Sequence, residues 1–234
     1  MKQDVIIQRL QAKQASIANF AGNKLIVDAS GTLIWPAKNL LVVSDLHFEK
    51  GSFLGAFANP IPHYDSHKTL QNLSEVIGYY SPQHVLCLGD SFHDNNAWLR
   101  LSQSERIEMI NLVNAQTKWT WILGNHDPDL PNELPGDKAA ELLIDNLLFL
   151  HEPNPDKPQN SAQVFGHFHP KMTKILARHR MTGRCFMHDQ TRMVLPSFGA
   201  YTGGLSIDDS AFDGILKTRI ANKHLIYQGK IYSL

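Results

Sequence analysis

Short continuous apolar runs recur along the chain, and each of them stops at a polar residue. The runs occupy residues 39–43, 85–88, 119–123, 147–150 and 162–165. Apolar runs of this length without alternation are typical of strands that are buried on both faces. The polar residues that follow them are, in chain order, Asp45, Asp90, Asn125, His151 and His167. The pattern therefore predicts a sheet whose strands end in side chains that can act as ligands.

Helical spacing of apolar residues separates these runs. It predicts helices over residues 66–77, 102–115 and 139–143, and the second begins with a capping-box pattern at Ser102 and Glu105. Strands that alternate with helices indicate an α/β architecture. In such sheets, ligands bind beyond the carboxyl ends of the strands, so residues that are far apart in the sequence meet at one site.

Further strands are expected on both sides of this region. Residues 24–28 and 32–35 are rich in β-forming side chains and are joined by a short connection, as in a hairpin. Residues 193–195 and 225–227 predict strands near the C-terminus. Because no repeat or long linker interrupts the chain, we expect a single domain over residues 1–234.

Composition and charge narrow the class of protein. With 43% hydrophobic and 19% charged residues in 234, the chain can fill a core, which excludes an intrinsically disordered protein. The 22 Lys and Arg residues balance the 22 Asp and Glu residues, so the whole molecule has no electrostatic attraction for nucleic acid or for an anionic membrane. Two cysteines and a charged N-terminal segment favour a reducing cytoplasm over export.

The polar strand ends belong to short motifs that combine carboxylates, imidazoles and one carboxamide. The motifs are Asp45-Leu46-His47, Gly89-Asp90 with His93, Gly124-Asn125-His126-Asp127, His151, and Gly166-His167-Phe168-His169. A set of oxygen and nitrogen donors without thiolate suits manganese, iron or zinc, and the donors are numerous enough for two metal ions. Glycine precedes three of the motif residues, as expected where the chain turns sharply off a strand.

These motifs, in this order, resemble those of the calcineurin-like metallophosphoesterases. The resemblance implies an α/β fold of two packed mixed β-sheets flanked by helices, an αββα sandwich, which strands in residues 192–234 complete. Segments 45–51, 92–94, 166–170 and 195–204 are most similar to the bacterial DNA-ligase-associated metallophosphoesterases. This narrower resemblance covers residues 24–205.

Carried over residue by residue, the resemblance implies two metal sites that share one carboxylate. One metal would be bound by Asp45, His47, Asp90 and His169. The other would be bound by Asp90, Asn125, His151 and His167. Metal ions that share a carboxylate and a hydroxide lower the pKa of the attacking water and stabilise the attacking and leaving oxygens at phosphorus. Manganese is the metal that we expect, with iron or zinc as alternatives.

Four more residues are candidates for chemistry around the metals. His126 would face the substrate as a general acid or as a phosphate stabiliser, and Asp127 would orient the His126 imidazole. His93 and Lys50 would contact phosphate. The alternatives are a structural hydrogen-bond donor for His93 and a solvated charge for Lys50.

Charge is unevenly distributed along this neutral chain. Residues 171–192 carry six basic side chains and one acidic side chain, a net charge of +5, whereas residues 128–152 carry a net charge of −5. Because the basic segment follows the last metal motif, we expect it to track a polyphosphate backbone; the alternative is a solvated charged hairpin. The side chains expected to contact the substrate are Lys171, Lys174, Arg178 and Arg180.

The leading hypothesis from the sequence is a metal-dependent phosphodiesterase or nuclease that acts on DNA in repair. The substrate rests on the resemblance, which also implies single-stranded DNA as a partner and a functional association with a DNA ligase and a helicase. A phosphatase or pyrophosphatase for small metabolites is the alternative. A non-enzymatic scaffold is disfavoured because every ligand type is retained.

Overall fold

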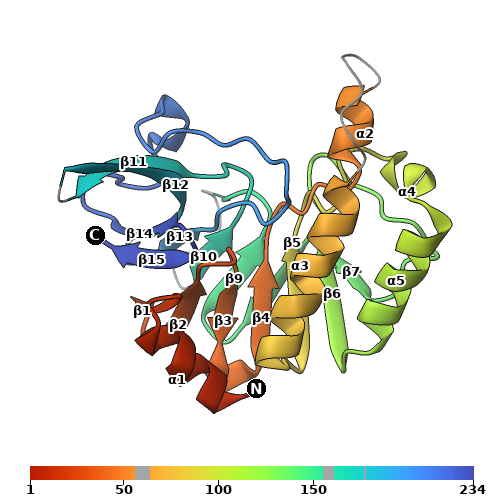
Figure 1. The fold of residues 1–234 in the computed structure, drawn as a ribbon, viewed down its shortest axis with the longest axis horizontal. Helices are drawn as coiled ribbons and strands as arrows, with labels where there is room; N and C mark the ends of the chain where they lie inside the picture. The colour runs from red at the N-terminus through yellow and green to blue at the C-terminus, as the bar shows by residue number, and fades with distance from the viewer. Residues whose placement is uncertain (56–63, 155–160, 177) are drawn as a thin grey trace.

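The computed structural model describes residues 1–55, 64–154, 161–176 and 178–234, and the strands in these residues form two β-sheets (Figure 1). The first sheet contains, in spatial order, β1 (Ala15–Phe20), β2 (Asn23–Asp28), β3 (Leu33–Trp35), β4 (Leu40–Val43), β5 (His84–Leu88), β6 (Lys118–Ile122) and β7 (Asp137–Ala139). The second contains β15 (Lys230–Ser233), β14 (Asn222–Tyr227), β12 (His179–His188), β13 (Arg192–Val194), β10 (Ala162–Phe165), β9 (Leu147–Leu150) and β8 (Glu141–Ile144). Strand β11 (Lys171–Leu176) pairs with β12 as a hairpin.

Both sheets are mixed, as the resemblance implies. Strands β4 to β7 are parallel, as are β9, β10 and β13, whereas the other neighbours are antiparallel. The predicted apolar strands are confirmed as β4, β5, β6, β9 and β10, and the predicted N-terminal hairpin as β2 and β3. In the register of the first sheet, Val43 lies beside Cys87 and Leu88 beside Ile122, so the parallel strands end at a common edge.

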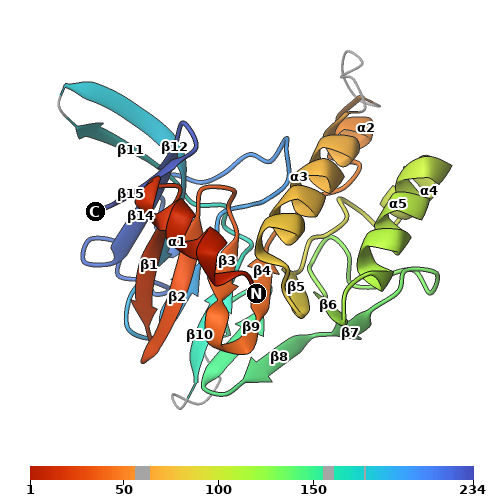
Figure 2. The ribbon, with the colours of Figure 1, turned by 60° about the horizontal axis from the view of Figure 1, so that its bottom comes forward.

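The apolar runs are buried on both faces because each sheet packs against the other sheet on one face and against further elements of the chain on the opposite face. Between the sheets, Val42 and Leu86 belong to one core with Phe149 and Val164. On the outer face of the first sheet, Leu41 packs in a second core with the helices α1 (Gln3–Gln11), α3 (Asp65–Tyr80) and α5 (Gln103–Asn114). These helices lie side by side over the sheet in Figures 1 and 2.

Smaller elements complete the molecule. The hairpin of β11 and β12, together with residues 207–221, covers the outer face of the second sheet, where the 3-10 helix η2 (Ser210–Phe212) lies. The remaining short helices are α2 (Lys50–Gly55), α4 (Ala97–Arg100) and the 3-10 helix η1 (Pro36–Lys38). The predicted capping box at the start of α5 is confirmed, because Ser102 and Glu105 exchange hydrogen bonds. In the described part of the chain, no helix is long and apolar enough to cross a membrane.

The prediction of a helix over residues 139–143 is wrong. This segment contains the end of β7 and most of β8, which pairs antiparallel with β9. Leu142 and Ile144 pack against the core between the sheets, whereas Leu143 between them is 58% exposed. Ala, Glu and Leu favour a helix locally, but pairing with the edge of β9 and burial of alternate side chains outweigh that preference.

Candidate metal centre

The loops that leave the parallel strands of both sheets meet at one edge of the molecule. Asp45 and Asp90 follow β4 and β5 in the first sheet, and His151 follows β9 in the second. The backbone amide of His167, after β10, donates to the carboxylate of Asp45 at 3.1 Å. This hydrogen bond joins the two sheets at their carboxyl ends, where α/β proteins commonly bind ligands.

The backbone conformation of these loops aims the side chains into the site. Five predicted ligands have positive φ angles, a conformation that is uncommon for residues other than glycine. The angles are 54° for Asp45, 46° for His47, 45° for Asp90, 68° for His167 and 46° for His169. Such strained residues persist only where the surrounding structure fixes them, and they concentrate at functional sites.

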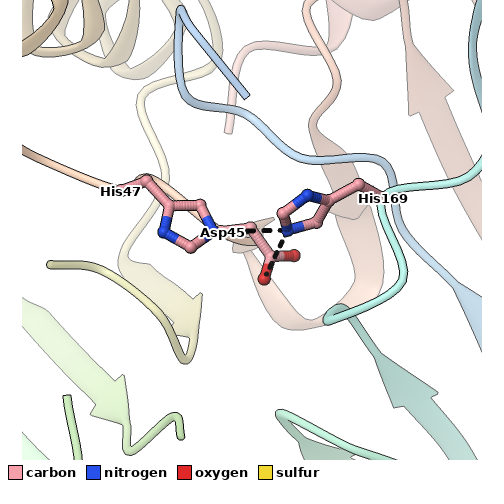
Figure 3. A group of neighbouring side chains, drawn as sticks. All are labelled: Asp45, His47 and His169. Atoms are coloured by element: carbon pink, nitrogen blue, oxygen red, sulfur yellow. Dashed lines mark hydrogen bonds and ion pairs between the residues drawn. The ribbon is translucent and has the colours of Figure 1, made fainter. Parts of the chain in front are cut away.

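Among the described residues, one group that can hold a metal ion consists of Asp45, His47 and His169. Figure 3 shows the two imidazoles approaching the Asp45 carboxylate from opposite sides. The Nε2 atoms of His47 and His169 are 3.4 Å apart, and His169 Nε2 lies 3.1 Å from Asp45 Oδ1. All three side chains offer a donor atom to the same small space.

A second such group in the described residues consists of Asp90, His151 and His167. The Nε2 atom of His151 lies 3.3 Å from Asp90 Oδ2 and 3.2 Å from His167 Nδ1. The predicted ligand Asn125 joins them, because its Oδ1 atom is 2.8 Å from His151 Nε2. Four donor side chains therefore converge here.

Asp90 lies between the two groups. Its Oδ2 atom is 3.3 Å from His151 in the second group and 3.9 Å from His47 in the first. Its other carboxylate oxygen accepts a hydrogen bond of 2.9 Å from the backbone amide of His126. This second contact fixes the rotation of the carboxylate, so that one oxygen faces both groups.

Neighbouring groups hold the ligands in place. The Nδ1 atom of His151 lies 3.0 Å from the carbonyl of Leu88, which accepts its proton and leaves Nε2 directed into the site. Ser44 donates a hydrogen bond to Asp45 Oδ2. The sequence reasoning missed Ser44, because a serine at a strand end carries no signal of its own. At Gly166 a Cβ atom would overlap Ser44 and Asp45, and at Gly124 it would overlap Asp90, so both positions require glycine.

The electrostatics of the site favour cation binding. Burial acts to raise the pKa of Asp45, but the hydrogen bond to His169 and the charges of the neighbouring histidines together outweigh burial and hold that pKa below its ordinary value. In the same way, burial acts to raise the pKa of Asp90, but the contact with His151, the amide of His126 and the charge of His47 together outweigh burial and lower that pKa. Burial lowers the pKa of His47 to about 3. Ionised carboxylates and a neutral imidazole are the forms that bind metal ions.

His151 differs from His47 in its protonation. Burial acts to lower its pKa, but the hydrogen bond to Asp90 and the charge of Asp45 outweigh burial and raise the pKa to about 9. A cation that binds to His151 must therefore displace a proton, so metal affinity should increase with pH. Taken together, the two groups and Asn125 fit a pair of divalent cations of the manganese, iron or zinc class.

His126 lies at the rim of the site with 42% of its side chain exposed. Its Nδ1 atom is 3.0 Å from the carbonyl oxygen of His93, and its Nε2 atom is 4.0 Å from Asp90 Oδ2. A proton on Nδ1 is thus held by a carbonyl, and Nε2 faces both the centre and solvent. His126 therefore borders the candidate centre and is open to solvent.

Asp127 contacts a different set of atoms from the one expected. Its buried carboxylate accepts hydrogen bonds from the backbone amides of Asp90, Ser91, Phe92 and Gly124. Burial raises the pKa of Asp127 to about 7, against the effect of these amide donors. The contact that orients the His126 ring comes from the carbonyl of His93 instead, and Asp127 fixes the two loops that carry Asp90 and Asn125.

His93 and Lys50 both border the centre. The ring of His93 stacks on His126, with centroids 5.2 Å apart, and meets His47 edge-on at 5.5 Å. Burial and the positive charge of Lys50 lower the pKa of His93 to about 4. Lys50 begins α2 and is half-buried; burial lowers its pKa, while the carboxylates of Asp45 and Asp90 act to raise it.

The basic residues predicted to bind substrate lie on the hairpin of β11 and β12, and its register separates them. Lys171 pairs with Arg184, and Ile175 pairs with Arg180, so Lys171 and Arg180 share one face. Lys174 pairs with Met181 on the opposite face. Arg178 is exposed in the turn, next to residue 177, which lies outside the described residues.

Comparisons with known proteins concern the family and the fold of the chain. The family model described as calcineurin-like phosphoesterase matches residues 38–192. A crystal structure of the nuclease MPE from Pseudomonas putida is similar with a TM-score of 0.73 and 24% sequence identity, covering 94% of this chain and 100% of that one. The phosphoesterase YfcE from E. coli is similar with a TM-score of 0.40 and 16% identity, covering 71% of this chain and 83% of its own. No curated protein matches the sequence.

Proposed function

The chain belongs to the calcineurin-like phosphoesterase family and is a metal-dependent hydrolase of phosphoester bonds, and we propose that its substrate is a phosphodiester in nucleic acid. The observation that carries the proposal is the position of Asp90 between two convergent groups of donors. Two adjacent metal ions can stabilise the attacking and the leaving oxygen of an in-line displacement at phosphorus. The likeness of the fold to a bacterial nuclease supports nucleic acid as the substrate class.

In this proposal, two divalent cations occupy the centre. Asp45, His47 and His169 would hold one, Asn125, His151 and His167 would hold the other, and Asp90, which lies between the two groups, would contribute to both. When bound, the cations supply Lewis-acid stabilisation of charge at phosphorus and lower the pKa of nearby water. The donors are oxygen and nitrogen atoms without thiolate, which suits manganese, iron or zinc, and manganese is the metal that we propose first.

His126 acts on the substrate directly in this proposal. Its Nε2 atom faces the centre and its Nδ1 proton is held by the His93 carbonyl. A doubly protonated imidazole in this position donates the Nε2 proton to the departing oxygen of the diester, or stabilises charge on the phosphoryl oxygens. His93 stacks on His126 and keeps its ring in this orientation.

The test compares three substrates under defined metal content. Purified protein is stripped with a chelator, reloaded with manganese, iron or zinc one at a time, and assayed on a nitrophenyl phosphodiester, a nitrophenyl phosphomonoester and a single-stranded DNA oligonucleotide. We expect hydrolysis of the diester and of DNA, with manganese the most effective metal. Activity on the monoester alone would instead favour the phosphatase alternative.

A matched pair of variants separates the metal centre from a contaminating activity. Asp45→Asn weakens a buried ligand, whereas Asp145→Asn changes an exposed carboxylate in the turn between β8 and β9. We expect the first to lose activity and the second to retain it. A role in DNA repair beside a ligase and a helicase extends this proposal, and it requires that single-stranded DNA be cleaved.

A further inference from the structure

The hairpin of β11 and β12 projects from the body of the molecule beside the metal centre. Figure 2 shows its far end extending beyond the other strands of the second sheet, to which β12 belongs. Strand β11 begins two residues after the ligand His169, and its first residue is anchored by hydrogen bonds with Leu205 and Ile207. At ~3.4 Å per residue, this strand extends about 17 Å outward.

The two faces of the hairpin differ in what they contact. On the inner face, Met172 and Met181 are buried in one core with Phe168 and Phe212. Leu176 on this face packs against the same core. Lys174 is exposed but lies close enough to Lys223 of β14 for its charge to add to the effect of burial in lowering the pKa of that lysine. The inner face therefore belongs to the packing of the second sheet.

The opposite face, which we call the outer face, is formed by Lys171, Thr173, Ile175, Arg180, Thr182 and Arg184. Thr173 and Thr182 share a hydrogen bond of 2.8 Å across the strands, which confirms that they lie on the same side. Arg180 is exposed, and Ile175 beside it is 68% exposed. A cation, two hydroxyl groups and an apolar side chain thus face solvent together.

The base of the outer face is joined to the metal centre. Arg184 donates hydrogen bonds to the carbonyl oxygens of Ser197 and Phe198, and the amide of Phe198 donates to Ser44, next to the ligand Asp45. The charge of Lys171 acts on Lys50, which is also in the field of Asp45 and Asp90. Positive charge therefore continues from the rim of the centre to the outer end of the hairpin.

Part of the acidic segment 128–152 lies away from the hairpin. In residues 128–152, which carry a net charge of −5, Asp137 lies in β7 and Glu141 in β8. Figures 1 and 2 place β7 on the side of the molecule away from the hairpin. A polyanion that approaches the centre would meet positive charge along the hairpin.

We propose that the outer face of the hairpin binds the phosphate backbone of a single-stranded nucleic acid whose scissile bond lies at the metal centre. The inference rests on the proposed function and adds the path of the strand. Lys171 and Arg180 contact phosphates, the two threonine hydroxyls add hydrogen bonds, and the exposed Ile175 packs against a base. An extended single strand fits this narrow ribbon because its backbone can follow the strand direction.

The experiment compares one charge-reversing substitution on each face of the hairpin. Arg180→Glu on the outer face and Lys174→Glu on the inner face change the net charge equally, and both residues are exposed on the same hairpin. The dissociation constant of a fluorescent single-stranded oligonucleotide is measured for the metal-loaded proteins over a range of salt concentrations. We expect Arg180→Glu to weaken binding by roughly 10-fold and to reduce the slope of the logarithm of affinity against the logarithm of salt concentration by ~0.7 or more. We expect Lys174→Glu to change both the affinity and this slope little.

Several outcomes would overturn the inference. Equal losses of affinity in the two variants would show that only the total charge matters. Unchanged affinity in both would show that the hairpin does not contact the nucleic acid. Face-dependent binding to phosphatidylserine vesicles without binding to the oligonucleotide would assign the outer face to a membrane. Melting temperature and metal content identify a variant that is misfolded; Arg180→Gln then replaces Arg180→Glu.

The same assays separate this inference from the proposed function. If the wild-type protein binds the oligonucleotide through the outer face but does not cleave it, the nuclease function is rejected while the binding face stands. If the protein cleaves the oligonucleotide with no difference between the two variants, the nuclease function stands and the binding face is rejected.

Discussion

At the scale of single residues, the metal centre depends most on Asp90. One of its oxygens faces both donor groups, and the other accepts a hydrogen bond from the amide of His126. In the proposed centre, the carboxylate would also supply negative charge that compensates the positive charge of two cations. Asn125, by contrast, contributes a neutral oxygen to the second group only.

We therefore expect Asp90→Asn to impair both sites and Asn125→Ala to weaken mainly one. Metal analysis after dialysis should give well under one equivalent of manganese for the first variant and about half of the wild-type content for the second. The hydrolysis of a nitrophenyl diester should fall more in Asp90→Asn. Wild-type metal content and activity in Asp90→Asn would rule out the shared carboxylate.

The role of His126 can be determined from how the effect of its substitution on the rate depends on the leaving group of the substrate. If Nε2 protonates the departing oxygen, His126→Ala should slow DNA cleavage by ~10² to 10⁴-fold, because an alkoxide leaves poorly without a proton. The loss should be smaller for a nitrophenyl diester, whose leaving group is already a stable anion. The rates of hydrolysis of both substrates, measured at equal metal content, test whether His126 donates this proton.

Equal losses on the two substrates would reject proton donation and leave electrostatic stabilisation of the phosphoryl oxygens. The variant His67→Ala is a suitable control, since His67 is an exposed histidine of α3. It should retain both activities.

At the scale of elements, a buried network ties α1 and α3 to β2. Arg9 of α1 donates two hydrogen bonds to Asp28, at 2.6 and 2.8 Å, and the hydroxyl of Tyr80 donates another. The Asp28 carboxylate is fully buried at the end of β2. Removing one member of such a network leaves the others buried without a partner.

We expect Asp28→Ala to lower the free energy of unfolding by ~3 to 5 kcal/mol, measured by urea denaturation. The matched control is Asp145→Ala, which removes the exposed ion pair with Lys38. Pairs of that kind contribute only ~0 to 1 kcal/mol. Similar effects of the two substitutions would mean that the Asp28 network does not join the helices to the sheet.

At the scale of the whole molecule, stability should depend on pH through a histidine pair in the second sheet. His188 of β12 and His224 of β14 are buried with their rings stacked, and their Nε2 atoms are 3.4 Å apart. Burial and the charge of His188 lower the pKa of His224 to about 4, from an ordinary value of 6.5. Burial also lowers the pKa of His188.

A lowered histidine pKa destabilises the folded protein in acid. Between pH 6.5 and about 4, the unfolded chain binds a proton at His224 that the folded chain does not, so the free energy of unfolding falls as pH falls. At ~1.36 kcal/mol per pKa unit, the loss amounts to about 3 kcal/mol. This destabilisation is complete below the pKa of His224 in the folded protein and absent above pH 7.

His224→Gln should therefore flatten the dependence of stability on pH, measured as the difference between pH 7 and pH 4.5 in urea denaturation. The histidines of the metal centre titrate in both proteins, so their contribution cancels in the comparison. His67→Gln, which changes an exposed histidine, should keep the wild-type dependence. An unchanged dependence in His224→Gln would exclude the pair as its source.

The sequence predicted those parts of the molecule that depend on local pattern. Strands β9 and β10 occupy the predicted residues, because continuous apolar runs report burial on both faces. The ligand types followed from the polar residue that ends each run, and the structure gathers all of the predicted ligands at one edge. Ser102 and Glu105 marked the start of α5 through a contact within one helical turn.

Other features depended on partners that no local pattern identifies. Residues 141–144 became strand β8 because the edge of β9 was available to pair with them. The carboxylate of Asp127 binds amides from a loop more than thirty residues away, which only the packing of β5 beside β6 brings within reach.

The hairpin register likewise decided that Lys171 and Arg180 share a face while Lys174 does not. A basic segment in the sequence shows that positive charge is present but not which face of the hairpin carries it, because a shift of one residue in the register turns every side chain to the other face. Local burial and ligand chemistry are properties of short segments, and the sequence determined them. Orientation and long-range contact depend on how strands align across two sheets, and only the tertiary structure decided them.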